Sequence, residues 1–178
     1  AKYGLKKNTY VVVRLVSLTS NHDKNTLGIS NPRDLVSFLK HYGTVFITSE
    51  DMLPPDLEAY KLRIAYQDIF DVLAFARLYV GESATMATES CLLGTPAIYA
   101  SSSERGYITD LEKNWHLVSW CKQDAETLAR AKEVLENPSA KKECLVAREV
   151  LLKSMIDVTA FMVSVVEKKT YLQKTLAK

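Results

Sequence analysis

The chain has 178 residues, of which 47% are hydrophobic, 25% charged and 9% aromatic. This composition is typical of a folded globular protein and excludes an intrinsically disordered one. The 23 basic and 21 acidic side chains leave a formal charge of only +2, which argues against a dedicated nucleic-acid binder. The sequence has no apolar run of transmembrane length, and its first residues lack the apolar stretch of a signal peptide. We therefore expect a single domain.

Three cysteines lie far apart in the sequence, namely Cys91, Cys121 and Cys144. None belongs to a Cys-x-x-Cys pair and their number is odd, so neither a disulfide framework nor a zinc site is predicted. We expect buried, reduced thiols in a cytoplasmic protein and no metal ion.

The first predicted elements alternate between strand and helix. Residues 9–18 form a β-branched, apolar run that is typical of a central strand covered on both faces. A helix is predicted over 32–42, with Asn31 as its N-cap and a proline in its first turn. A strand is predicted over 44–48. Residues 57–64 are ambiguous, with a short helix and then a strand as one interpretation.

The same alternation continues to the end of the chain. Helices are predicted over 68–76, 85–93, 107–113 and 125–135, and strands over 77–80, 97–100 and 117–120. From about residue 139 the sequence is helical, with a break near Asp157. This order predicts an α/β fold, a Rossmann-like parallel sheet of about six strands with helices on both faces.

The terminal helical segment, residues 139–178, carries eight basic and four acidic side chains. A basic helix is most often a solvated face. It is also typical of a helix that contacts another domain or an anionic membrane surface. The sequence leaves these three interpretations open.

The most informative segment follows the strand predicted over 77–80. In an open parallel sheet, ligands bind at the carboxyl ends of the strands. Gly81 and the small residues Ser83 and Ala84 allow a ligand to approach the backbone there. Ser83 and Thr85 offer hydroxyl groups where the next helix begins, and the free N–H groups of that helix make an anion site. We therefore predict a diphosphate site at Ser83, Ala84 and Thr85.

Glu89 lies four residues after Thr85, about 6 Å further along the helix. Helical side chains lean toward the N-terminus, so its carboxylate is predicted to reach over the first turn and accept from the two hydroxyls of a ribose. A capping box needs Ser or Thr where Met86 stands. Neither Thr85 nor Leu93, its neighbours four residues away, forms an ion pair. A solvated glutamate is the remaining alternative.

For Arg14 and His22, near the beginning of the chain, the sequence leaves more than one role open. Arg14 interrupts an apolar strand, and a buried arginine needs a partner, which is either an internal carboxylate or a ligand phosphate. His22 stands beside Asp23 in a polar segment, where it donates to a phosphate, acts as a general acid, or holds the loop. The sequence has no Gly-x-Gly-x-x-Gly and no Walker A motif, which disfavours a nicotinamide dehydrogenase and a P-loop enzyme.

The segment from Gly81 to Pro96 resembles the nucleotide-sugar signature in the C-terminal domain of GT-B glycosyltransferases. The pattern is similar to that of the lipid-II N-acetylglucosaminyltransferase and of the UDP-N-acetylglucosamine 2-epimerases. The chain resembles still more an uncharacterised prokaryotic family, domain of unknown function 354, whose members look like longer GT-B proteins. That likeness is also carried by Val11–Arg14, Ser20–Asp23, Gly28–Ser30, Ile47–Glu50 and Ile156–Phe161. Ser83 departs from the family pattern, which more often has a glycine there.

The resemblance implies a UDP-type nucleotide-diphosphate sugar as ligand, with no required cofactor or metal. The nucleotide-binding residues that it implies are Arg14, Ser20, His22, Ile64, Ala65, Ser83, Ala84, Thr85 and Glu89. Among them, Ile64 and Ala65 would lie against the base. The catalytic base would come from an N-terminal domain of the same protein that this chain does not contain. The sequence leaves open whether the terminal segment 139–178 packs on this domain or on that one.

Three hypotheses follow. The first is the donor-binding domain of a glycosyltransferase-like protein, which is not catalytic alone. The second is half of a nucleotide-sugar epimerase or hydrolase, with the same binding residues. The third is a non-catalytic α/β interaction module, in which Glu89 has no ligand.

Overall fold

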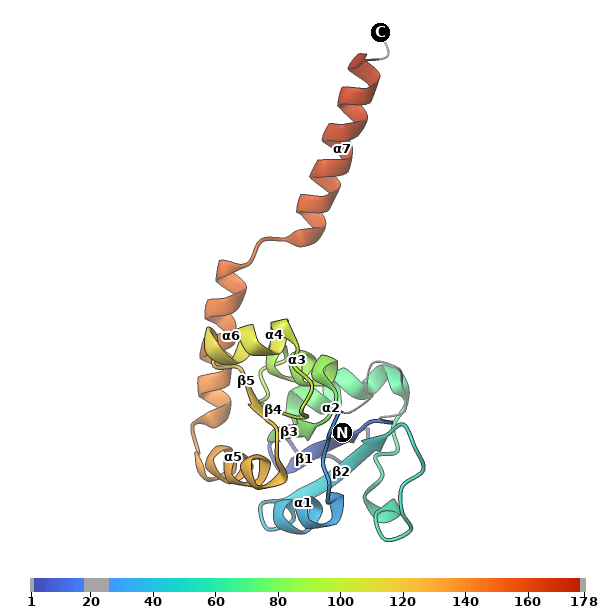
Figure 1. The fold of residues 1–178 in the computed structure, drawn as a ribbon, viewed down its shortest axis with the longest axis vertical. Helices are drawn as coiled ribbons and strands as arrows, with labels where there is room; N and C mark the ends of the chain where they lie inside the picture. The colour runs from blue at the N-terminus through green and yellow to red at the C-terminus, as the bar shows by residue number, and fades with distance from the viewer. Residues whose placement is uncertain (1, 18–25, 177–178) are drawn as a thin grey trace. The chain divides into compact units, whose positions relative to one another are not determined.

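The computed structural model describes residues 2–17 and 26–176, of which 168–176 are described by their backbone. The chain divides into two compact units, Ala1–Arg148 and Glu149–Lys178. The first unit has a single sheet of five parallel strands with helices on both of its faces (Figure 1). The second unit consists of the end of one helix and the whole of the last one.

The strands are β1 (Tyr10–Leu15), β2 (Thr44–Ser49), β3 (Leu78–Gly81), β4 (Ala97–Ala100) and β5 (Val118–Cys121). All neighbours pair in parallel, in the order β2-β1-β3-β4-β5. The order reverses between β1 and β3, so the segments that leave these two strands diverge there. Such a switch point, at the carboxyl ends of the strands, is where open α/β sheets bind their ligands.

The sheet has five strands, whereas the sequence predicted about six. The sixth was expected within residues 57–64, which instead form a 3₁₀ turn at Glu58–Tyr60 and one parallel bridge between Ile47 and Lys61. The N–H group of Leu62 donates to the carbonyl of Ile47 at 2.8 Å, but the pairing ends there. A few residues further on, the N–H group of Ala65 donates to the side chain of Tyr3 and not to a strand.

The helices are α1 (Pro32–Leu39), α2 (Ile69–Phe75), α3 (Ala84–Leu92), α4 (Gly106–Lys113), α5 (Asp124–Glu136), α6 (Ala140–Ser154) and α7 (Val158–Leu176). Helices α1 and α5 contact each other on one face of the sheet, while α3 contacts α2 and α4 on the other face. The sheet is therefore covered on both faces, which explains why β1 is almost continuously apolar.

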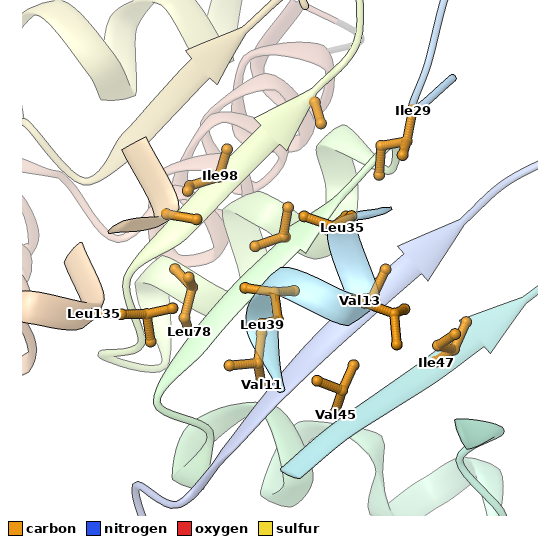
Figure 2. Close-up of a cluster of buried hydrophobic side chains, with 14 of the residues drawn as sticks. Val11, Val13, Ile29, Leu35, Leu39, Val45, Ile47, Leu78, Ile98 and Leu135 are labelled. Carbon is orange, nitrogen blue, oxygen red and sulfur yellow. The ribbon is translucent and has the colours of Figure 1, made fainter. Parts of the chain in front are cut away.

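The core between the sheet and the α1–α5 layer is built from alternate strand residues. Val11 and Val13 of β1 point to this side, where they meet Leu35 and Leu39 of α1 (Figure 2). On the opposite side, the buried hydroxyl of Tyr10 donates to a carbonyl of α2 at 2.6 Å. The period of two in β1 thus separates two apolar layers.

Several local predictions are confirmed. Asn31 is the N-cap of α1, where its side chain accepts from the N–H group of Asp34, although α1 ends at Leu39, earlier than predicted. The helical tail breaks between Ser154 and Val158, at the predicted place. All three cysteines are free and buried. Among the described residues, no helix combines the length and the apolar character that crossing a membrane requires.

Candidate functional site

A cleft of about 560 Å³ opens at the carboxyl ends of the strands in the first unit. Its walls come from the segments that follow β1 and β2, from the first turn of α3, and from the connection between β4 and α4. Three of the residues predicted from the sequence, namely Ser83, Ala84 and Thr85, line it. The cleft therefore lies at the switch point of the sheet, with the beginning of α3 as one wall.

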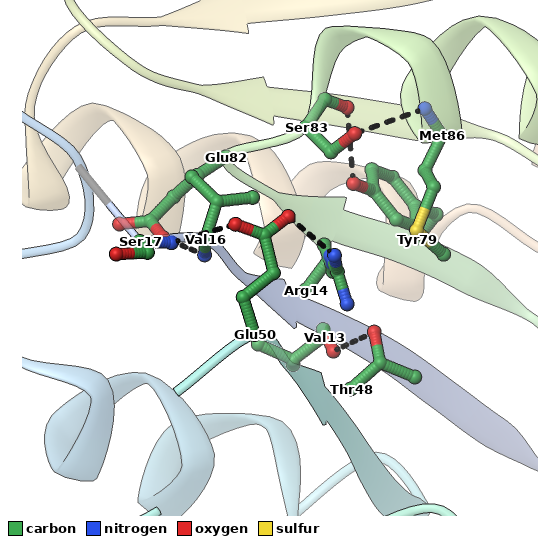
Figure 3. Close-up of polar contacts among 10 residues, drawn as sticks. All are labelled: Val13, Arg14, Val16, Ser17, Thr48, Glu50, Tyr79, Glu82, Ser83 and Met86. Atoms are coloured by element: carbon green, nitrogen blue, oxygen red, sulfur yellow. Dashed lines mark hydrogen bonds and ion pairs between the residues drawn. The ribbon is translucent and has the colours of Figure 1, made fainter. Parts of the chain in front are cut away.

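The first turn of α3 is fixed by its neighbours. Ser83 is the N-cap, and its hydroxyl accepts from the N–H group of Met86 at 3.3 Å. The hydroxyl of Tyr79 donates to the carbonyl of Ser83 at 3.1 Å (Figure 3). Among the residues that the structure describes, none accepts from the N–H groups of Ala84 and Thr85. These two amides, at the positive end of the helix dipole, suit an anion.

Gly81 brings α3 close to β1. It pairs with Arg14 across the sheet, and a Cβ atom on it would lie 2.7 Å from the Cβ of Arg14 and 2.8 Å from its carbonyl oxygen. Real Cβ atoms do not approach this closely. Only glycine therefore allows the turn into α3 to begin directly beside the end of β1.

Arg14 is held by an internal carboxylate. Its Nη2 donates to Oε1 of Glu50 at 2.6 Å, and Oε2 of Glu50 accepts from the N–H group of Ser17 at 3.0 Å (Figure 3). The Nε atom of Arg14 is buried and has no partner. Of the two partners left open by the sequence, the structure shows the carboxylate. Glu50 lines the cleft, and Arg14 does not.

Glu82 joins the two ends of the segment between β1 and α1. One oxygen of its carboxylate accepts from Val16 N–H at 2.7 Å and the other from Ile29 N–H at 2.8 Å. Burial raises the pKa of Glu82, and the charges of Asp124 and Glu50 act in the same direction, whereas the two amides oppose them. A Cβ on Gly28 would lie 2.0 Å from this carboxylate, so a larger residue there would displace the side chain of Glu82.

Glu89 lies half-buried on α3. Within the described part of the chain its carboxylate has no hydrogen bond and no ion pair, in agreement with the absence of a partner at its helical neighbours in the sequence. It is not among the residues that line the cleft. Burial raises the pKa of Tyr79, the positive charge of Arg14 opposes that rise, and the negative charges of Glu82 and Glu89 add to it. Glu89 thus acts electrostatically on a hydroxyl that contacts the first turn of α3.

The other predicted residues fall elsewhere. Ile64 and Ala65 are half-buried and do not line the cleft. The resemblance assigns Ala65 to the base, whereas in the structure its N–H group donates to the hydroxyl of Tyr3 at 3.0 Å. Ser20 and His22 lie outside the described residues.

Glu82 and the wall between β4 and α4 were not predicted from the sequence. That wall includes Ser101, Arg105 and Tyr107, and Arg105 stands at the beginning of α4. The rule that ligands bind at the carboxyl ends of strands points to residues 101–107 as well, because they follow β4. No group of three or more His, Cys, Asp or Glu residues within 2–17 and 26–176 is arranged to hold a metal ion.

Comparisons with known proteins give the fold. No protein-family model and no curated protein sequence matches this chain. Among solved structures, it is similar to the calicheamicin glycosyltransferase CalG4, with 15% identity and a TM-score of 0.53 over 96% of this chain and 43% of that one. The spinosyn rhamnosyltransferase SpnG with its aglycone shows 11% identity and a TM-score of 0.53, over 81% of this chain and 42% of that one.

The wall teichoic acid polymerase TagF is a third similar structure, with 10% identity and a TM-score of 0.50 over 97% of this chain and 46% of that one. This chain therefore spans less than half the length of the three structures. At such low identities the likeness concerns the fold alone. The chain has a GT-B-like α/β fold with a parallel five-stranded sheet.

Proposed function

We propose that this chain is the donor-nucleotide-binding domain of a glycosyltransferase-like protein, with a UDP-type nucleotide-diphosphate sugar as its ligand. The observation that carries the proposal is the pair of amides at Ala84 and Thr85. They lie at the N-terminus of α3, lack an acceptor among the described residues, and belong to residues that line the cleft. The GT-B-like fold of the chain supports the same function.

In this proposal the diphosphate lies on the first turn of α3. The helix amides hold its oxygens, and Ser83 keeps the turn in place through its cap. When the glycosidic bond to the sugar breaks, negative charge develops on the departing diphosphate. Fixed amide dipoles stabilise that charge without rearranging, which is the main way in which such a site accelerates transfer.

Glu89 is the proposed ribose ligand. A carboxylate without an internal partner is satisfied by two vicinal hydroxyls, as in dinucleotide folds. The catalytic base and the acceptor site belong, in this proposal, to a further domain of the same protein. The chain alone then binds nucleotide without turnover.

Calorimetric titration with UDP and with 2′-deoxy-UDP tests the proposal. The wild-type chain is expected to bind UDP more tightly than the deoxy form, because a hydrogen bond to a carboxylate is lost. In Glu89→Gln the affinity for UDP falls roughly tenfold, as expected for hydrogen bonds to a charged group, and the preference for UDP over its deoxy form decreases.

Glu143→Gln is the matched control, since Glu143 is an exposed glutamate of α6 that does not line the cleft. It should leave both titrations unchanged. No heat from UDP at millimolar concentration would reject the proposed function. An unchanged preference between the two nucleotides in Glu89→Gln would reject only the role of Glu89.

A further inference from the structure

The ion pair between Arg14 and Glu50 stands between a strand end and the cleft. Arg14 is at the carboxyl end of β1, and its side chain is only 20% exposed, whereas that of Glu50 is 46% exposed. Glu50 and Ser17 line the cleft, but Arg14 does not. The guanidinium therefore faces the carboxylate (Figure 3), and the carboxylate lines the cleft.

The contacts of Glu50 are those that a phosphate group would make. One of its oxygens accepts from a guanidinium at 2.6 Å and the other from the backbone N–H group of Ser17 at 3.0 Å. An arginine together with a backbone amide is a donor set that proteins use for phosphate oxygens. Arg14 also has a donor to spare, since its buried Nε has no partner.

We propose that Glu50 is a displaceable internal counter-ion, which covers Arg14 in the free protein and gives way to a phosphate of the ligand. This inference rests on the proposed function, because it concerns the regulation of the same cleft. The site is closed to weak or singly charged anions by its own carboxylate. A diphosphate, with more charge and with the amides of α3 as further donors, competes successfully for Arg14.

Glu50 and Glu82 differ in how easily each leaves its place. Glu50 is nearly half exposed, and ion pairs with such exposure contribute little to stability. Glu82 is more buried, and moving it would leave two amides, those of Val16 and Ile29, without an acceptor. Because unpaired buried amides are costly, Glu82 stays in place while Glu50 moves.

The test is titration of the whole chain with inorganic pyrophosphate and with UDP, for wild type and for Glu50→Gln. Glutamine keeps the shape and an acceptor for Ser17 N–H but loses the charge. Pyrophosphate is expected to bind Glu50→Gln roughly tenfold more tightly than wild type, because a like charge leaves the cleft wall and Arg14 is uncovered. UDP affinity rises in the same direction.

The control is Glu58→Gln. Glu58 also pairs with an arginine, Arg63, at 2.8 Å and is 40% exposed, but it does not line the cleft. Its substitution should change neither affinity. In the double variant Glu50→Gln with Arg14→Met, the gain for pyrophosphate disappears. Folding of the methionine variant is checked by thermal melting. If it does not fold, Arg14→Lys in the same background replaces it. The lysine variant is expected to retain part of the gain in pyrophosphate affinity.

The outcomes separate this inference from the proposed function. If wild type binds UDP but Glu50→Gln binds pyrophosphate no more tightly, the counter-ion role is wrong and the function stands. A gain that persists without Arg14 also overturns the counter-ion role. If wild type does not bind UDP while Glu50→Gln gains pyrophosphate affinity through Arg14, the function is wrong and the counter-ion role stands. Absence of binding in every case rejects both.

Discussion

The amino and carboxyl ends of the strands differ in whether nearby polar groups are hydrogen-bonded. At the amino ends, where α2 finishes and β4 begins, the ammonium of Lys141 donates to the carbonyls of Ala74 and Ala76 at 2.8 and 2.6 Å, and lies 3.0 Å from the hydroxyl of Thr95. At the carboxyl ends, the amides of Ala84 and Thr85 find no acceptor among the described residues. The ammonium of Lys141 thus has acceptors at the amino ends, whereas these two backbone donors at the carboxyl ends have none in the described part of the chain.

This difference separates stability from binding. Buried polar groups are almost always hydrogen-bonded, and a group that breaks the rule needs an explanation. Lys141 is hydrogen-bonded, as the rule requires, and we therefore expect it to stabilise the fold. The unpartnered Nε of Arg14 and the open helix amides lie beside the cleft, where a ligand is the natural partner. Substitutions at the amino ends should therefore change the free energy of unfolding and leave nucleotide affinity alone.

The largest effect is expected for Lys141→Met. It removes two charge-assisted hydrogen bonds to carbonyls, each of which contributes about 1.5 kcal/mol, and also the burial cost that lowers the pKa of this ammonium, so the free energy of unfolding should fall by at most about 3 kcal/mol in urea titrations. UDP affinity should not change. Lys142→Met is the control, because the neighbouring Lys142 is exposed and its loss should cost less than about 0.5 kcal/mol. A loss of UDP binding in the folded Lys141→Met variant would contradict the separation of the two ends.

The second effect concerns alkaline pH. Burial raises the pKa of the Cys91 thiol from 9.0 to about 12, so the folded state keeps this proton while the unfolded chain loses it. Stability from this group is complete below pH 9 and falls as the pH rises from 9 toward 12. The slope is about 1.4 kcal/mol per pH unit for one thiol. Urea titrations between pH 8 and 10.5 should show a shallower decline for Cys91→Ala than for wild type.

Lys141 changes the free energy of unfolding with pH in the opposite direction. Its contribution is the same in wild type and in Cys91→Ala, so it cancels when the two are compared. Burial lowers the pKa of Lys141 to about 8 from 10.5, so its share of the stability rises with pH between these values. Ser90→Ala is a matched control, since Ser90 is a buried residue of the same helix that does not titrate. It should leave the slope as in wild type, and equal slopes for all three proteins would reject the buried-thiol explanation.

The sequence predicts the local features of both ends and misses the contacts that join distant segments. Alternating strands and helices, the cap at Asn31 and the turn at Ser83 follow from spacing within a few residues. The pair of Arg14 with Glu50 depends on the register that sets Arg14 opposite Thr48, which no local pattern encodes. The predicted sixth strand is absent from the sheet for the same reason: its formation depends on pairing with a distant strand. Pairing at Lys61 depends on where Ile47 lies and not on strand propensity alone.

The smallest expected effect is at His116, just before β5. Its φ of +54° lies in the left-handed region, which costs a side chain other than glycine about 1 kcal/mol or more. Glycine removes this strain, but it makes the unfolded chain more flexible, so folding costs about 0.5 kcal/mol more in conformational entropy. His116→Gly should therefore raise the free energy of unfolding by about 0.5 kcal/mol. Asn8→Gly, at φ +59°, should gain less, because the short polar side chain of asparagine can hydrogen-bond locally in this conformation.

Titration of His116→Gly with UDP tests whether a residue at the amino ends of the strands contributes to nucleotide affinity. Strain is sometimes stored at functional sites, where it serves the ligand and its relief costs affinity. His116 borders hollows beside β5 and not the cleft at the carboxyl ends, so relief of its strain should leave UDP affinity unchanged. If His116→Gly were more stable but bound UDP more weakly, the amino ends would also contribute to binding. The division between a stabilising end and a binding end would then have to be abandoned.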